Sequence, residues 1–100
     1  MSQIEATQLK LAEFNDAPGA EAAAKILNEW HVGDWAEVSE GSRDYWQNDE
    51  ATIVLRVRGT DSFPNFIDGL NFGKALNELR PDEFDTMRDY DVTLIRLWWD

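Results

Sequence analysis

The segment 90–99, "YDVTLIRLWW", constrains the fold most strongly, because it is apolar on both faces of an extended chain. Successive side chains of a strand point to opposite faces. Both sets of alternate positions are apolar here: Val92, Leu94 and Trp98 on one face, and Ile95, Leu97 and Trp99 on the other. A strand with two apolar faces is central or is covered on both sides. We therefore predict such a strand at 90–99.

Two further segments have the pattern of helices. Residues 16–30 are rich in alanine and carry an apolar stripe at helical spacing, which predicts a helix. Residues 61–79 have apolar residues at similar spacing and are followed by Pro81, which ends a helix. Gly69 and Gly73 weaken this second helix, so we expect a break or two short helices there.

The remaining segments predict strands and connections. Residues 32–40 alternate between polar and apolar, and 51–59, "ATIVLRVRG", has the clearest strand pattern. Residues 41–50 are polar and turn-prone, which indicates a loop, and 82–87 are expected to form a turn or a single helical turn. Residues 3–13 fit either a strand or a helix, and we favour a strand.

The resulting order of strand, helix, strand, strand, helix, strand predicts an α+β fold. We expect a two-layer sandwich in which two helices cover a small, mostly antiparallel sheet of three or four strands. A ferredoxin-like βαββαβ arrangement fits this order, and a helix at 3–13 would leave three strands. No internal repeat or long linker divides the chain, so residues 1–100 are expected to form one domain.

The net charge of −11 is unevenly distributed along the chain. Most of the excess of 20 acidic over 9 basic residues lies in two segments, 29–50 and 82–91. Clustered like charges repel one another and lower the stability of the folded state, so their segregation indicates a surface that binds something basic.

The sequence contains no recognisable catalytic or metal-binding motif. Cysteine is absent, and His31 is the only histidine, at a predicted helix end where it can interact with the helix dipole. The segment "GLNFGKALNE" lacks the spacing and the Ser or Thr of a phosphate-binding loop. Five carboxylates could ligate a hard cation, but without the glycine register of calcium loops: Asp82, Glu83, Asp85, Asp89 and Asp91. We therefore expect a protein that is not an enzyme, with no catalytic residues, cofactor or metal ion.

The N-terminal segment lacks a secretion signal, and no segment has the length of a membrane span. Together with the absence of cysteine, this predicts a soluble protein of the cytoplasm, present as a monomer or homodimer.

The acidic segments provide the candidate partner-binding residues. On a strand, alternate carboxylates form a ladder whose spacing resembles that of successive phosphates. The carboxylate candidates are Asp34, Glu37, Glu40, Asp44, Asp49, Glu50, Asp82, Glu83, Asp85, Asp89 and Asp91. Tyr45 and Trp46 lie in the polar loop, where we expect them to be exposed or half-exposed and to anchor an interface.

In size, lack of cysteine and clustered acidic residues, the chain resembles phage-encoded nucleic-acid mimics of the anti-CRISPR and anti-restriction type. The resemblance implies an inhibitor that binds the basic nucleic-acid-binding surface of a defence nuclease complex. Its carboxylates would take the place of DNA or RNA phosphates. The protein itself would not bind nucleic acid, and it would act in the cytoplasm of the host cell if phage-encoded.

A second resemblance is to barstar-type nuclease inhibitors. The run "FPNFIDGLNFGKALNEL" followed by the strand "DVTLIRLWW" is similar to that family's sequence of Phe-Pro, an aromatic residue, a turn, an Ala-Leu helix and a strand. It covers less than half of the chain. The acidic residues do not lie on the helix that carries the family's binding carboxylates, so those roles are not transferred. Two alternatives remain: an immunity protein that neutralises a cognate nuclease toxin, and an acidic structural or interaction subunit.

Overall fold

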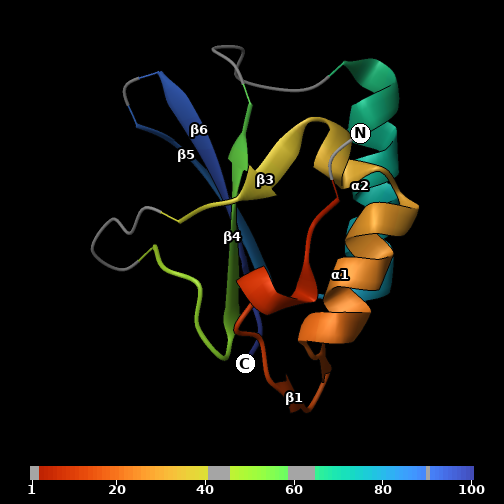
Figure 1. Cartoon of the computed structure of the whole chain (residues 1–100), viewed down its shortest axis with the longest axis vertical. Coiled ribbons are helices and arrows are strands. Elements are labelled where there is room, and N and C mark those ends of the chain that lie inside the picture. Colours follow the sequence, from red (N-terminus) through yellow and green to blue (C-terminus); the bar gives the residue numbers. More distant parts are fainter. Residues whose placement is uncertain (1–2, 41–45, 59–64, 90) are drawn as a thin grey trace.

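Two helices pack against one face of a four-stranded antiparallel sheet (Figure 1). The computed structural model describes residues 3–40, 46–58, 65–89 and 91–100. In chain order the elements are the 3-10 helix η1 (Ala6–Gln8), β1 (Glu13–Phe14), β2 (Ala17–Pro18), α1 (Ala20–Glu29), the 3-10 helix η2 (Val32–Asp34), β3 (Ala36–Val38), β4 (Thr52–Val57), α2 (Phe66–Leu79), β5 (Glu83–Asp89) and β6 (Val92–Trp98).

The strand order in the large sheet is β3-β4-β6-β5, and every neighbouring pair is antiparallel. β6 therefore lies between β4 and β5, and Leu97 is opposite Ile53 on one side and Phe84 on the other. This confirms the α+β fold and the central position predicted for the last strand. β1 and β2 form a separate two-stranded hairpin.

The main core lies between the helices and the sheet. Its large side chains are almost fully buried, and each of them contributes roughly 1.5–3 kcal/mol through removal from water. They include Leu27, Ile53, Leu55, Leu79, Ile95, Leu97 and Trp99. The indole N–H of Trp99 also donates to the Leu79 carbonyl oxygen at 3.0 Å, which joins the end of α2 to the end of the sheet.

Both predicted helices are present, but α2 is unbroken. Asn65 is its N-cap, with a side-chain oxygen that accepts a hydrogen bond from the Asp68 backbone N–H at 2.9 Å. The break expected near Gly69 and Gly73 does not occur. A glycine inside a helix costs about 1 kcal/mol, and the buried residues of α2, such as Phe72, offset this cost.

The N-terminal segment does not contribute a strand to the large sheet. Ile4 and Leu9 are buried against the core, yet their segment hydrogen-bonds to a helix instead of a strand. The Asn28 side chain of α1 accepts from the Ile4 N–H at 2.8 Å and donates to the Ile4 carbonyl at 2.9 Å. The strand that we favoured at 3–13 is therefore wrong as a sheet strand.

The fourth strand is β5, where we expected a turn. It pairs with β6 over its whole length, from Glu83 opposite Trp98 to Asp89 opposite Val92. In the four-stranded sheet, each helix is consequently followed by a pair of strands, in the order α-β-β-α-β-β. This order excludes the ferredoxin-like βαββαβ arrangement for the described elements.

The second face of the sheet is covered in part by Trp46, from the described part of the connection between β3 and β4. Trp46 from this connection packs with Val54 of β4 and Leu94 of β6 in a small apolar cluster, joined by Met87 and Val92. Figure 1 shows residues 46–51 of this connection on the side of the sheet opposite the helices. The apolar residues on both faces of β6 are thus explained by a cover on each side.

We predict that Asn28→Ala lowers the free energy of unfolding by about 1–3 kcal/mol, because it leaves the N–H and C=O groups of Ile4 without their partner. Urea-induced unfolding followed by tryptophan fluorescence measures the change. Asn77→Ala, at an exposed position of α2, is the matched control and should change stability by less than about 0.5 kcal/mol. An equal loss in both variants would contradict this role of Asn28.

Candidate functional site

One end of the large sheet brings together residues from both acidic segments. Glu83 at the start of β5 lies opposite Trp98 of β6, and Trp98 lies opposite Thr52 of β4. Asp49 forms an antiparallel bridge with Thr52. Neighbouring strands are about 4.8 Å apart, so Glu83 and Thr52 are separated by about 10 Å. Residues far apart in sequence therefore meet at this end.

Backbone contacts add further segments to the same place. The Asn15 side chain donates to the Asp100 carbonyl oxygen at 3.2 Å, and the Ala12 N–H donates to the Glu50 carbonyl oxygen at 2.9 Å. The β1–β2 hairpin and the end labelled C accordingly lie together in Figure 1. We call this exposed surface the acidic end; its carboxylate residues are Glu13, Asp16, Asp49, Glu50, Asp82, Glu83, Asp85 and Asp100.

Two of these carboxylates are held by the backbone. An Asp49 carboxylate oxygen accepts from the Ala51 N–H at 2.8 Å, and an Asp82 carboxylate oxygen accepts from the Asp100 N–H at 2.7 Å. Hydrogen bonds to an ionised acceptor are stronger than those between neutral groups. These side chains are therefore ordered before a partner arrives, which reduces the entropy that binding would cost.

Two cations lie beside the acidic end. A guanidinium nitrogen of Arg96 is 2.9 Å from an Asp85 oxygen and 3.5 Å from a Glu83 oxygen, and the guanidinium lies 5.8 Å from the centre of the Trp98 ring. Lys10 lines a shallow depression together with Glu50. Exposed ion pairs contribute only about 0–1 kcal/mol. The acidic end has more carboxylates than these cations can neutralise, so it remains strongly negative.

The other candidate carboxylates do not join this surface. Asp89 is at the opposite end of β5, six positions from Glu83 and therefore about 20 Å away. Asp91 follows in the same turn region, whereas Asp34 ends η2, and Glu37 forms an ion pair with Arg58 at 3.4 Å. The strand register therefore separates members of the two acidic segments, and they do not all meet at the acidic end.

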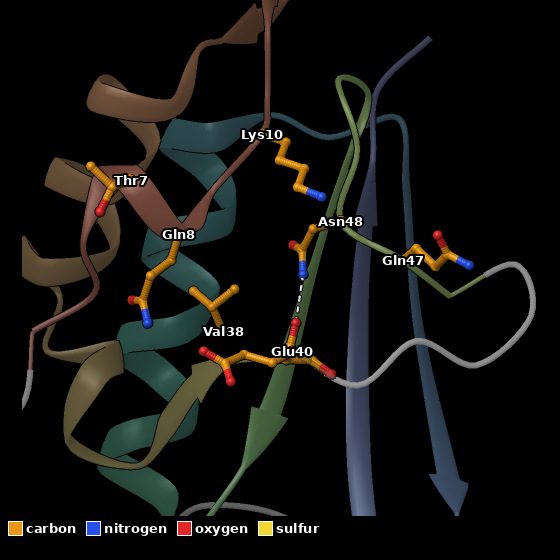
Figure 2. A pocket seen from close by; sticks show the side chains of 8 residues that line it. Thr7, Gln8, Lys10, Val38, Glu40, Gln47 and Asn48 are labelled. Carbon is orange, nitrogen blue, oxygen red and sulfur yellow. Dashed lines mark hydrogen bonds between the residues drawn. The ribbon is translucent and has the colours of Figure 1, made fainter.

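Glu40 lines a hollow of about 500 Å³ that shares Lys10, Gln47 and Asn48 with the depression beside Glu50. The hollow is lined by Thr7, Gln8, Lys10, Val38, Ser39, Glu40, Gln47 and Asn48. Figure 2 shows Lys10 directed toward Asn48, with Glu40 across the hollow from Lys10. The Asn48 amide donates to the Ser39 carbonyl and accepts from the Val54 N–H, both at 2.8 Å. Asn48 therefore joins Ser39, which follows β3, to Val54 of β4.

The expected aromatic anchors require a correction. Trp46 is only 7% exposed, because its indole covers apolar residues on the second face of the sheet instead of pointing to solvent. The polarity of the neighbouring residues concealed this role. Tyr45 and Asp44 lie outside the described residues.

The described residues include neither a cluster of metal-binding side chains nor a membrane-spanning helix. In these parts of the chain, no group of three or more His, Asp or Glu side chains is placed to hold a metal ion. No helix among them is both long and apolar enough to cross a bilayer. His31 is exposed at the end of α1, in a left-handed conformation with φ of 59°.

Sequence reasoning missed three acidic residues and an apolar surface. Glu13, Asp16 and Asp100 lie outside the two acidic segments, and only tertiary pairing brings them to the acidic end. Large apolar side chains are also exposed on α2 and β5. They are Phe66, Ile67, Leu70 and Phe84, with exposures from 79% for Phe66 to 42% for Phe84.

Comparison with protein families, with curated proteins and with solved structures finds no significant match to this chain.

We predict that Trp46→Ala lowers the free energy of unfolding by about 3–5 kcal/mol, as expected for a large aromatic side chain lost from a packed cluster. Phe66→Ala is the matched aromatic control, because Phe66 is 79% exposed, and it should cost less than about 0.5 kcal/mol. Thermal and urea unfolding measure both changes. A Trp46 variant as stable as the native protein would restore this residue as an interface candidate.

Proposed function

We propose that the protein is a non-enzymatic inhibitor that binds the basic nucleic-acid-binding surface of a defence nuclease complex, in the manner of anti-CRISPR proteins. It acts in the cytoplasm, that of the host cell if phage-encoded, and it presents carboxylates where the complex would bind DNA or RNA phosphates. The protein itself does not bind nucleic acid.

The main support is the convergence of carboxylates from separate segments at the acidic end. These residues come from the β1–β2 hairpin, the turn before β4, the start of β5 and the residue after Trp99, and all of them are exposed. A concentrated negative field accelerates association with a basic partner and disfavours wrong partners of like charge. A net charge of −11 makes direct association of this surface with nucleic acid unfavourable.

A second support is the spacing of two carboxylates on β5. Glu83 and Asp85 occupy alternate positions of the strand, so they point to the same face and lie about 7 Å apart. Arg96 contacts both carboxylates and fixes their orientation. An ordered pair at this spacing can replace successive phosphates in a groove lined by lysine and arginine.

The compactness of the acidic end favours a second candidate, an immunity protein that blocks the active site of a nuclease toxin. Thr52 of β4 and Glu83 of β5 are about 10 Å apart at the acidic end, whereas Asp89 is about 20 Å from Glu83, at the other end of β5. A small negative surface fits the cleft of a single nuclease domain, while an extended duplex groove would also engage more distant acids.

We predict that Glu50→Lys combined with Glu83→Lys weakens capture of the partner from a host lysate by at least about tenfold, because like charges then face each other across the contact. The control variant, Glu29→Lys with Asp34→Lys, has the same change in net charge away from the acidic end and should bind within about twofold of the native protein. The native protein and the two double variants are immobilised, and the amount of lysate protein that each retains is measured. The retained protein is identified by mass spectrometry.

The captured protein should be displaced by a short DNA or RNA duplex and by salt raised from about 50 mM to about 500 mM, because screening weakens contacts between exposed charges. Loss of duplex binding by a multi-subunit complex supports the defence inhibitor, whereas loss of cleavage by a single-domain nuclease supports immunity. A partner without affinity for nucleic acid, or equal effects of the two double variants, would contradict both.

A further inference from the structure

β5 is a long edge strand with one side open. In the described sheet it pairs only with β6, and it has 7 residues, whereas β3 at the other edge has 3. In an antiparallel pair, every second residue directs its N–H and C=O groups away from the neighbouring strand. β5 therefore presents a row of backbone hydrogen-bonding groups that can accept another strand.

The two faces of β5 differ in chemistry. Glu83 and Asp85 lie on the outer face, the side away from the helices. Phe84 lies on the helix side, where its ring is 5.8 Å from that of Phe72 in α2, and it remains 42% exposed. A strand added at this edge would meet the carboxylates of Glu83 and Asp85 along one face, and the Phe84 ring together with Thr86 and Arg88 along the other.

The flank of α2 beside β5 has room for side chains of an added strand. Lys74 lies over the Trp30 ring, with its ammonium 5.3 Å from the ring centre, so this side of α2 faces α1. At 100° per residue, Phe66, Gly69 and Gly73 lie on the other flank, away from α1. A Cβ atom added at either glycine would meet no neighbouring atom within 4 Å. This flank is therefore open, and Phe72 of the same helix contacts the exposed ring of Phe84.

Charge disfavours a second copy of the chain as the occupant. Antiparallel pairing of two β5 strands about Thr86 would set Glu83 of each copy opposite Asp89 of the other, and like charges directly opposite are destabilising. Each copy also carries a net charge of −11. A strand with alternating basic residues has the complementary charge.

We propose that β5 binds an extended basic segment of the partner protein as a fifth strand of the sheet, an inference that rests on the proposed function. Alternate lysine or arginine side chains of this segment contact Glu83 and Asp85, and the intervening small or apolar side chains contact Phe84 and the glycine flank of α2. The backbone hydrogen bonds supply affinity, and the alternation of side chains supplies specificity.

The test uses a defined peptide, acetyl-Lys-Val-Lys-Val-Lys-Val-Lys-amide, and two derivatives. One carries backbone N-methyl groups on the valines and the other on the internal lysines. The N–H groups of alternate residues in a strand point to opposite sides. Strand addition therefore predicts that one methylated peptide loses binding by at least about tenfold, while the other binds nearly as well as the parent. Calorimetric titration measures the affinities, and amide hydrogen exchange should show protection at alternate residues of β5.

A pair of variants tests the flank of α2. Gly73→Leu places a large side chain on this open flank of α2 and should weaken binding of the parent peptide by about fivefold or more, whereas Ala22→Leu, at an exposed position of α1, should leave the affinity unchanged. Equal binding of all three peptides would mean that only charge attracts them. That result would contradict strand addition. Absence of binding by all three peptides would contradict it as well. The proposed function is decided separately, by the charge-reversal variants and the captured partner.

Discussion

The structure depends on the burial of both faces of β6. One face of this strand packs under the helices through Ile95 and Leu97, and the other meets Trp46 through Leu94. Because β6 also pairs on both edges, with β4 and β5, it connects the two apolar clusters and the two halves of the sheet. A strand with two apolar faces removes more surface from water than one with a solvated face, which matters in a chain of 100 residues with a modest core.

The same strand places the candidate site. The residues at the end of β6 fix the position of β5 through Glu83, of β4 through Thr52 and of the N-terminal hairpin through Asp100. The register of the strands thus assembles the acidic end. Repulsion among its carboxylates lowers the stability of the folded state, which apolar burial raises. Arg96, which lies on β6 itself, relieves part of this repulsion through Asp85 and Glu83.

Elements with a strong local pattern could be predicted from the sequence. α1, β4 and β6 have clear periodicity, and their existence followed from it. β5 could not be recognised, because an edge strand with one face of Glu83 and Asp85 buries too little surface to show apolar alternation, and its pairing with β6 determines its structure. The N-terminal segment alternates like a strand, but the Asn28 side chain, distant in sequence, provides the hydrogen bonds of Ile4.

The site was only partly predictable for the same physical reason. Charge density along the chain identified Asp49, Glu50, Asp82 and Glu83, but the sequence contained no sign that the strand register would place Asp89 at the far end of β5.

The position of Asp100 decides where a label can be attached. The backbone of Asp100 is tied to Asp82 and Asn15 within the acidic end. A label attached at residue 100 would lie within this surface and would shield it, so labels for interaction studies are better placed at a surface cysteine introduced on α1.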